Sequence, residues 1–385
     1  MPPLLVHVSL EHPYAAWGGI SSALDLLVKA SVSAGQPVAI ISLGPSDQVI
    51  PIGASAHLYV VGVPELAATV LYRHPDRIVL ARLASERMTG CLASIRRGAE
   101  VNLCVHNDEL VRLVELCSAS PWLRSCVGFI HGLARQEHPG RPELHQQQDD
   151  FLNAVGTAAV LSQLYAQTVR RFYPALRRIA VVRPPLELLA EEAASRRRRR
   201  SAAAMPGTFL AAGRSVPQKG FDILLRALQG VLPGPVQGVD LIMGHGDPAY
   251  ERTCRSLAAR AAVEVSLRPW TSRAAVLGTI VTAWAVVMPS RFEPLGLLAA
   301  EALAHDVPVI ASSVGGLQEL VADPADGWLV PATEGAGPDA KQLAETMLAA
   351  ASCRSAVSRG AEHLGRWRVS DCLTDLAQLM EKGAV

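Results

Sequence analysis

The chain of 385 residues is long enough for two domains of ordinary size and too long for one compact core. Apolar residues make up 50% of it and charged residues only 18%, which excludes a largely disordered chain. Its 36 basic and 35 acidic residues nearly cancel, so we expect no general affinity for nucleic acid, which needs a clear positive excess on one face.

The 7 cysteines are scattered, odd in number and without a CxxC pair. Neither a zinc site nor a disulfide framework is expected, and reduced, buried thiols are the plain interpretation. The strand-like stretch Leu4–Ser9 opens the chain without a signal-peptide pattern. The longest apolar run, Leu277–Met288, is too short to span a bilayer. We therefore expect a cytoplasmic protein with no stable membrane insertion and leave its oligomeric state open.

Short apolar runs rich in β-branched residues alternate with longer helical patterns, which is typical of a parallel α/β fold. In the first half, these runs predict strands at Leu4–Ser9, Val38–Ser42, Leu58–Val61, Asn102–Val105, Cys126–Ile130, Ala159–Ser162 and Ile179–Arg183. Helical patterns lie between several of them, at Ile20–Ala34, Leu110–Ala119 and Gln163–Tyr173. We expect one Rossmann-like domain over residues 1–185.

The second half restarts the same alternation. Its predicted strands are Thr208–Ala212, Val239–Met243, Val263–Ser266, Ala285–Met288, Val307–Ala311 and Trp328–Val330. Its predicted helices are Phe221–Leu228, Tyr250–Ala261, Leu297–Ala304, Ala340–Ala350 and Val369–Lys382. We expect a second Rossmann-like domain over residues 207–363, followed by a terminal helical segment, 364–385.

A charged, low-complexity stretch separates the two halves and predicts an interdomain linker over residues 186–206. It includes the run Arg196–Arg200. Docking of these arginines to RNA or to a membrane is the alternative, but they lack the aromatic interleaving and the amphipathic spacing of such segments. Two doubly wound parallel sheets would then face each other across a cleft, with the active site at the carboxyl ends of their strands.

The strongest local signal is the loop Ser290–Gly296, which follows the predicted strand Ala285–Met288 and leads into a helix. Pro294 suits a helix start, and the free amides after it would point toward a bound phosphate. Glu293 precedes the helix, and Glu301 lies about 9 Å further along it at ~1.5 Å per residue. Two carboxylates that far apart cannot share a metal or a proton, but they can hold hydroxyls at the two ends of a diphosphate.

Each acid also has a plainer interpretation: Glu293 as part of a helix cap, and Glu301 as a solvated helix position. Glu301 is flanked by Leu297, Leu298, Ala300 and Leu303, and a lone carboxylate in such surroundings usually has a specific partner. We therefore favour function for both.

The second signal, Gly213–Gly220, follows the predicted strand Thr208–Ala212 and leads into the helix at Phe221. Arg214 and Lys219 place one cation at the strand end and another at the helix start. Together they could offset the charge of a diphosphate and stabilise it as a leaving group. A surface turn with solvated cations is the alternative. Lysine is rare in this chain, which makes Lys219 worth weighing.

Together the two motifs resemble the retaining GT-B glycosyltransferases typified by glycogen synthases, sucrose synthases and bacterial mannosyltransferases, a group like glycosyltransferase family 4. The family pattern G-R-x(4)-K-G, E-x(7)-E and a glycine pair stands here as Gly213-Arg214…Lys219-Gly220, Glu293…Glu301 and Gly315-Gly316. The resemblance covers nearly the whole second domain. It implies a GT-B fold whose last helix returns to the first domain.

The first half resembles the family more loosely. Trp17-Gly18-Gly19-Ile20 looks like its glycine loop, where backbone amides approach the donor phosphate, although a simple strand-to-helix turn is the alternative. His131 in Phe129-Ile130-His131-Gly132 resembles the family's strand-end histidine, which faces the donor sugar, although a histidine that merely closes a strand is the alternative. His106 and Asp108 end another predicted strand and could meet the acceptor. The segment Pro139–Asp150 fits no family pattern and shapes an acceptor pocket or forms a loop.

The resemblance implies roles by position. Arg214 and Lys219 would bind the diphosphate, Glu293 the donor sugar and Glu301 the ribose. Gly18, Gly19, Gly213 and the Pro294-Leu295-Gly296 turn would approach the phosphate or sugar, and Arg268 would border the base. His131 would join Arg214, Lys219 and Glu293 in catalysis. The family's front-face displacement needs no metal and no cofactor beyond the nucleotide sugar that serves as co-substrate.

The sequence thus predicts a retaining glycosyltransferase that moves a sugar from a UDP or GDP sugar to a soluble, hydrophilic acceptor, either a small natural product or a polysaccharide end. A sugar-phosphate or pseudo-glycosyl synthase is the nearest alternative, for which Arg135 and Arg141 offer cations. A catalytically silent sugar-nucleotide-binding protein is a second alternative. A nicotinamide dehydrogenase is disfavoured, because Gly244-His245-Gly246 lacks the third glycine of the dinucleotide fingerprint.

Overall fold

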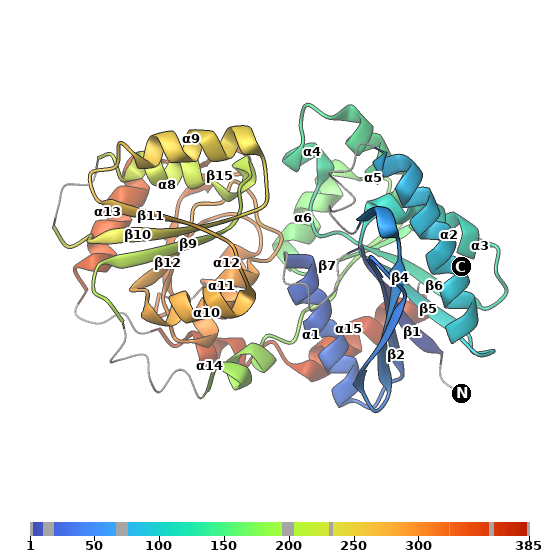
Figure 1. The fold of residues 1–385 in the computed structure, drawn as a ribbon. Helices are drawn as coiled ribbons and strands as arrows, with labels where there is room; N and C mark the ends of the chain where they lie inside the picture. The colour runs from blue at the N-terminus through green and yellow to red at the C-terminus, as the bar shows by residue number, and fades with distance from the viewer. Residues whose placement is uncertain are drawn as a thin grey trace. The chain divides into compact units, whose positions relative to one another are not determined.

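A computed structural model describes residues 3–10, 19–66, 76–194, 204–230, 234–322, 324–353 and 358–382. The chain divides into two compact units, one made of Met1–Pro184 with Val369–Val385 and the other of Pro185–Arg368. Each unit has helices on both faces of a mostly parallel sheet (Figure 1). The predicted α/β fold with two doubly wound sheets is confirmed.

The first unit contains an eight-stranded sheet in the order β3-β4-β2-β1-β5-β6-β7-β8. Its strands are β1 (Leu4–Val8), β2 (Val38–Gly44), β3 (Gln48–Gly53), β4 (Ala56–Gly62), β5 (Val101–Val105), β6 (Leu123–Phe129), β7 (Thr157–Val160) and β8 (Arg178–Val181). All neighbours pair in parallel except β3, which runs antiparallel to β4 at one edge. The order reverses between β1 and β5, which makes this the topological switch point of the sheet.

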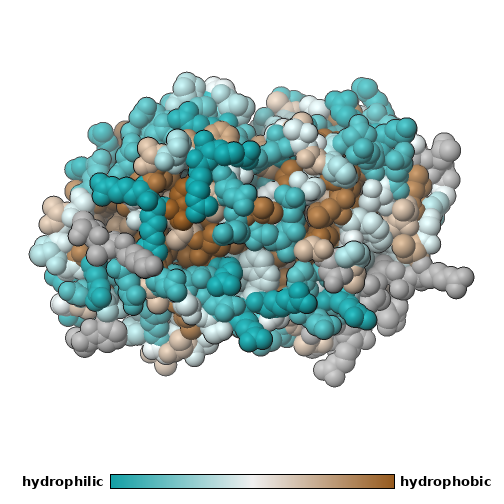
Figure 2. Space-filling view, turned by 180° about the vertical axis from the view of Figure 1, so that it is seen from behind, coloured by the Kyte–Doolittle hydropathy of each residue, from teal (hydrophilic) through white to brown (hydrophobic). Residues whose placement is uncertain are grey.

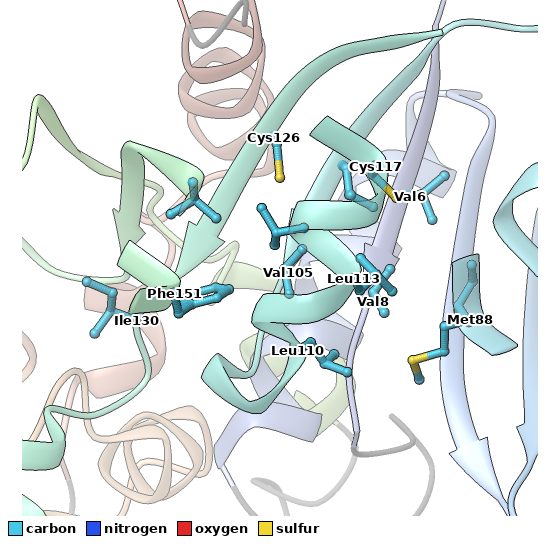
Figure 3. Close-up of a cluster of buried hydrophobic side chains, with 14 of the residues drawn as sticks. Val6, Val8, Met88, Val105, Leu110, Leu113, Cys117, Cys126, Ile130 and Phe151 are labelled. Carbon is cyan, nitrogen blue, oxygen red and sulfur yellow. The ribbon is translucent and has the colours of Figure 1, made fainter. Parts of the chain in front are cut away.

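Helices cover both faces of this sheet. On one face α1 (Gly19–Ser33) packs against α15 (Val369–Lys382), and α15 also contacts β6 and β8. The other face carries α2 (Arg77–Ile95), α3 (Val111–Ser118) and α5 (Pro142–Val155), with α6 (Gln163–Phe172) beside β7 and β8. Leu113 and Cys117 of α3 lie beside Val6, Val8 and Val105 of the sheet in this buried core (Figure 3).

The second unit contains a six-stranded, all-parallel sheet in the order β11-β10-β9-β12-β13-β14. Its strands are β9 (Thr208–Arg214), β10 (Gly238–Gly244), β11 (Glu264–Pro269), β12 (Ala285–Met288), β13 (Val309–Ser312) and β14 (Gly327–Val330). Here the order reverses between β9 and β12. Helices α8 (Phe221–Ala227), α9 (Pro248–Ala258) and α13 (Ala340–Ala351) pack together on one face. Helices α10 (Arg273–Thr282), α11 (Leu297–Ala304), α12 (Leu317–Leu320) and α14 (Gly360–Leu364) form the other.

Strands predicted from apolar runs occur with bounds that differ by a few residues at most. The structure adds β3, α2, α5 and α10. Helices α2 and α10 have weak periodicity, α5 is rich in polar residues, and β3 is a short, largely exposed edge strand interrupted by Pro51, so each leaves little signal in a single sequence. Part of the expected linker 186–206 is ordered: residues 187–194 are helical, and Leu186, Leu189 and Ala193 are buried. The arginine run Arg196–Arg200 lies outside the described residues.

The surface visible in Figure 2 is mostly hydrophilic, with groups of apolar residues between the polar ones. Large apolar side chains that are exposed among the described residues are Val49, Ile78, Val79, Phe172, Met205 and Leu329. Over the same part of the chain, every helix is too short or too polar to cross a membrane.

The close packing of β6 against α5 in the first unit offers a test of this fold. Gly128 lies in β6, and an added Cβ would come 2.7 Å from a ring carbon of the buried Phe151 of α5 (Figure 3). Overpacking of this kind costs about 1–3 kcal/mol, so Gly128→Ala should lower the free energy of unfolding by that amount in urea titrations. At Gly90, in α2, the space around an added Cβ is open among the described residues. Gly90→Ala should therefore raise stability by about 0.5–1 kcal/mol, and equal effects at the two sites would contradict this packing.

Candidate functional site

The two motifs of the second unit follow the two strands at its switch point. Loop 213–220 comes from the end of β9, and loop 289–296 comes from the end of β12. These strands are direct neighbours and parallel, so both loops leave the same edge of the sheet. Open α/β sheets bind ligands outside the carboxyl ends of their strands at this reversal. The topology therefore brings together two segments that are more than seventy residues apart, as the 74-residue separation of Lys219 and Glu293 shows.

Backbone contacts join the two loops directly. The N–H of Arg291 donates to the carbonyl of Gln218 at 2.8 Å, and the Gln218 side chain donates to the carbonyl of Phe292 at 3.4 Å. Gly220 has a positive φ of 65°, and a Cβ there would lie 1.9 Å from the carbonyl oxygen of Pro289. Only glycine permits both this conformation and this approach. The loops therefore form one surface rather than two adjacent ones.

The side chains of Lys219 and Glu293 meet on this surface. Nζ of Lys219 lies 2.7 Å from Oε2 of Glu293, and the exposed fractions of the two side chains are 19% and 9%. The hydroxyl of Ser290 donates to the same carboxylate oxygen at 3.3 Å. A charge-assisted hydrogen bond in such partial burial is stronger than its neutral counterpart. One cation and one acid are thus held at the same place, where a ligand could meet both.

A partly buried network that joins the loop of Glu293 to α8 was not expected from the sequence. The guanidinium of Arg291 donates to both oxygens of Asp222 at 2.9 and 2.8 Å, and the hydroxyl of Tyr250 donates to Asp222 at 2.6 Å. Burial opposes ionisation of Asp222, yet the bonds from Arg291 and Tyr250 hold its pKa below the ordinary value. Arg291 belongs to the loop of Glu293, and Asp222 to the first turn of α8. The signal was one charged residue inside the second loop, Arg291, and one just after the first loop, Asp222, neither of which the diphosphate interpretation used.

The glycine pair after β13 supports the loop of Glu293 from the other side. The N–H of Gly316 donates to the carbonyl of Glu293 at 3.0 Å, and a Cβ on Gly315 would lie 2.1 Å from that oxygen. Gly296, with a φ of 100°, precedes α11 at the end of the Pro294-Leu295-Gly296 turn. Leu295 and Pro294 are themselves buried. The turn expected to approach a phosphate or sugar is thus held rigidly at the switch point.

Glu301 has the specific partner that its apolar surroundings predict. The Nε–H of Arg273, in the first turn of α10, donates to its carboxylate at 2.6 Å. Burial raises the pKa of Glu301, while the charge of Arg273 acts in the opposite direction and that of Glu192 adds to the rise. A small cavity opens beside this pair, lined by Glu192, Leu277 and His305 among others. Arg273 was not singled out in the sequence, because its partner is brought to it only by helix packing.

The remaining residues of the second unit are less closely grouped. Arg214 is exposed at the end of β9, after Gly213, and its guanidinium lies 3.4 Å from the side-chain oxygen of Gln218. Arg268 lies on the edge strand β11, two strands from β9, and pairs with Asp240 of β10 at 2.7 Å. The structure therefore brings Arg214, Lys219 and Glu293 onto the joined loops, and it places Arg268 apart from them.

In the first unit three histidines come from neighbouring strands at the switch point. His7 lies in β1 opposite Cys104 of β5, His106 follows β5, and His131 follows β6. Side chains alternate along a strand, and Val6, Val8, Val105 and Ile130 all face the α3 core. The three histidines therefore share the opposite face. This alternation was readable in the sequence for His7, which interrupts an apolar run, although it was not used.

The three imidazoles are hydrogen-bonded in series. Nδ1 of His7 lies 2.9 Å from Nε2 of His106, and Nδ1 of His106 lies 2.9 Å from Nε2 of His131. Phe129 stacks on His106 with ring centroids 4.6 Å apart. Burial lowers the pKa of His7 to about 4 and that of His131 to about 4. Both nitrogens of the buried His106 are used in these two bonds, and its expected contact with an acceptor stays a prediction.

The other expected residues of the first unit fall into two groups. Asp108 is held by α5, whose Gln147 and Gln148 donate to its carboxylate at 3.1 and 3.3 Å, and burial raises its pKa. The segment Pro139–Asp150, which fitted no pattern, is thus largely helix and positions Asp108. Gly19 is the first residue of α1, whereas Gly18 lies outside the described residues.

Part of the second unit matches a family of known proteins. Residues 206–352 match the family described as "Glycosyl transferases group 1". The chain is 30% identical over 235 residues to a D-inositol 3-phosphate glycosyltransferase of Xylanimonas cellulosilytica, covering 55% of this chain and 56% of that relative. It is 40% identical over 116 residues to a glycogen synthase of Thioalkalivibrio sulfidiphilus, covering 29% of this chain and 24% of that one. The matched stretches thus span little more than half of the first relative's length and about a quarter of the second's.

The whole chain also resembles a solved structure. The sucrose-phosphate synthase from Thermosynechococcus elongatus aligns with a TM-score of 0.75 at 19% identity, covering 99% of this chain and 98% of that one. At this identity the likeness concerns the fold. The chain therefore has the GT-B fold, and its residues 206–352 form a glycosyl transferases group 1 domain.

Proposed function

We propose that the chain is a retaining glycosyltransferase that moves a sugar from a nucleoside diphosphate sugar, UDP- or GDP-linked, to an acceptor hydroxyl. The observation that carries this proposal is the meeting of Lys219 and Glu293 at 2.7 Å on two joined loops at the switch point. A cation beside an acid suits a ligand that has an anionic phosphate next to a sugar with several hydroxyls. We propose that the protein acts in the cytoplasm and that the reaction uses no metal.

The roles follow from charge and position. Lys219 and the exposed Arg214 would neutralise the diphosphate as its negative charge grows, which is stabilisation of the transition state. Glu293 would hold sugar hydroxyls, Glu301 the ribose, and His131 of the first unit the sugar. In the free protein Lys219 donates a hydrogen bond to Glu293. A bound donor would replace this one charge-assisted hydrogen bond with two, one to each side chain.

The transfer itself needs no enzymic nucleophile. The bond from the anomeric carbon to the leaving phosphate oxygen breaks while the acceptor oxygen bonds to that carbon on the same face. The acceptor proton passes to the leaving phosphate, so charge and atoms balance and the anomeric configuration is retained. The contribution of the protein is then to position the two substrates and to stabilise charge.

For the acceptor we propose a soluble, hydrophilic molecule, either a small natural product or a polysaccharide end. A phosphorylated acceptor is the second candidate, favoured by the names of the inositol phosphate and sucrose-phosphate relatives. The two cations considered for it, Arg135 and Arg141, form ion pairs with Asp149 and Glu143 in the structure. Both arginines are more exposed than Lys219, so these pairs are weak and would yield to a phosphate as Lys219 would yield to the donor. This candidate therefore stays open as the second.

Replacing either member of the central pair should reduce turnover without removing the fold. Lys219→Ala and Glu293→Gln should each lower kcat/KM by at least ~100-fold, the range observed when a contact made in the transition state is lost. Initial rates with the preferred donor would measure this. Lys341→Ala is the matched control, because Lys341 is a solvent-exposed lysine of the same unit with an exposed fraction of 85%. Rates near normal in the Lys219 or Glu293 variant would refute the assigned roles.

Donor binding should be detectable before any acceptor is known. A ligand that binds only the folded state raises its stability by RT ln(1 + [L]/Kd), about 2.7 kcal/mol at a concentration of ~100 Kd. We expect one sugar nucleotide from a panel of UDP, GDP, ADP and TDP sugars to raise the melting temperature, and Glu293→Gln to weaken that rise. A shift followed by no turnover with any acceptor would favour a silent sugar-nucleotide-binding protein. No shift with any member at millimolar concentration would refute the proposal.

A further inference from the structure

The chain of three histidines in the first unit has two different ends. Its two hydrogen bonds use four of the six ring nitrogens and leave Nε2 of His7 and Nδ1 of His131. His7 is fully buried, and among the described residues no partner reaches its Nε2. His131, in contrast, is only partly buried. One end of the chain is therefore sealed in the protein, and the other is open to a ligand or to water.

The rings are uncharged near neutral pH. Burial lowers the pKa of both end rings, His7 and His131, to about 4. Burial, together with electrostatic repulsion from the neighbouring rings of His131 and His7, holds the pKa of His106 well below its ordinary value. Three neutral imidazoles carry one N–H each, so the chain holds three protons for its two hydrogen bonds.

The third proton must lie at one of the two ends. If it lies on Nδ1 of His131, then Nε2 of His131 accepts from His106, and His106 in turn accepts from His7. If it lies on Nε2 of His7, every bond runs in the opposite direction. The tautomers of the three rings are thus coupled: all three are protonated at Nδ1, or all three at Nε2.

The sealed end distinguishes these two states. In the second state His7 buries an N–H with no acceptor among the described residues, whereas in the first it buries only a bare nitrogen. Among buried backbone groups, N–H donors are left unpaired more rarely than acceptors, and we apply the same order to ring nitrogens. The first state also places the third N–H at the open end, where a ligand oxygen or water can accept it.

We propose that His7 and His106 are positioning residues that set the tautomer of His131, so that His131 presents an Nδ1–H donor at the end of β6. The stack of Phe129 on His106 holds the middle ring in the plane that both bonds need. The three linked histidines are not a route for protons through the unit, because Nε2 of His7, at their buried end, has no acceptor among the described residues. The effect is to fix which ring nitrogen of the neutral His131 donates and which accepts.

The consequence for binding rests on the proposed function. A donated hydrogen bond from His131 would select a ligand oxygen, such as a sugar hydroxyl, over a ligand N–H group at this place. Losing one neutral hydrogen bond costs about 0.5–1.5 kcal/mol, which corresponds to a change of about 2- to 10-fold in the KM of the donor.

The tautomers can be read directly. Protein labelled with ¹⁵N in its 11 histidines would be recorded in a long-range ¹H–¹⁵N correlation spectrum at neutral pH, where protonated and bare ring nitrogens resonate far apart. Substitution of each histidine in turn assigns the signals. We expect His7, His106 and His131 to be neutral and protonated at Nδ1. A proton on Nε2 of any of the three would overturn the proposal.

Two variants of the middle ring test the coupling. His106→Phe removes both hydrogen bonds but keeps a flat ring, and it should let His131 populate both tautomers and raise the donor KM by about 2- to 10-fold. His106→Asn keeps an amide N–H near the place of Nδ1 and should return His131 to the Nδ1–H form. His57→Phe, at a histidine in β4 of the same sheet, is the control and should leave the His131 signal unchanged. A His131 that stays entirely Nδ1–H in His106→Phe would contradict the proposed coupling.

This spectrum does not depend on catalysis. If the wild-type protein turns over no sugar nucleotide, the proposed function fails while the tautomers are still measured. If turnover is observed and the tautomers differ from those expected, only the role of His7 and His106 is refuted.

Discussion

The ion pair between Lys219 and Glu293 depends on the contact between two loops that leave adjacent strands of the second sheet. Backbone hydrogen bonds join these loops, and Gly220 lets them approach to a distance that no side chain would allow. In addition, Arg291 of the second loop forms a partly buried, doubly bonded ion pair with Asp222 of α8, the helix that follows the first loop. Lys219 and Glu293 can therefore keep one separation, because the loops that carry them are joined by more than one contact. A site that stabilises charge needs this rigidity before any ligand arrives.

The first unit also holds polar groups in fixed positions, but these groups are uncharged. Its three histidines come from three parallel strands, and hydrogen bonds with a stacked aromatic ring hold them in line. Burial keeps the two end rings uncharged near neutral pH. Which ring nitrogen donates and which accepts is therefore set by the tautomer of each ring and not by its ionisation. Asp108 stands nearby under a different constraint, held by two glutamines of α5. Both units thus place their polar groups at a sheet reversal, where parallel strands end side by side.

Several features of the site were predictable because they are local. The loops containing Lys219 and Glu293 follow short apolar strands and precede helices, so their place at a sheet edge could be inferred from pattern alone. Other features depend on pairs distant in sequence. Arg273 and Glu301 are joined only by the packing of α10 on α11, and Arg291 meets Asp222 only after the loops join. His7 was passed over because a histidine within an apolar strand has no local signal that separates a buried neutral ring from a ligand.

By itself, the sequence determined the alternation of strands and helices, the two sheet-forming halves and the residue types at each strand end, since periodicity and turn chemistry act over a few residues. The tertiary structure decided which strand ends became neighbours, and hence which side chains met. It paired Lys219 with Glu293, gave Glu301 its arginine and used both nitrogens of His106. Strand order is the physical reason, because it depends on how the whole sheet buries its apolar faces, which no single segment specifies.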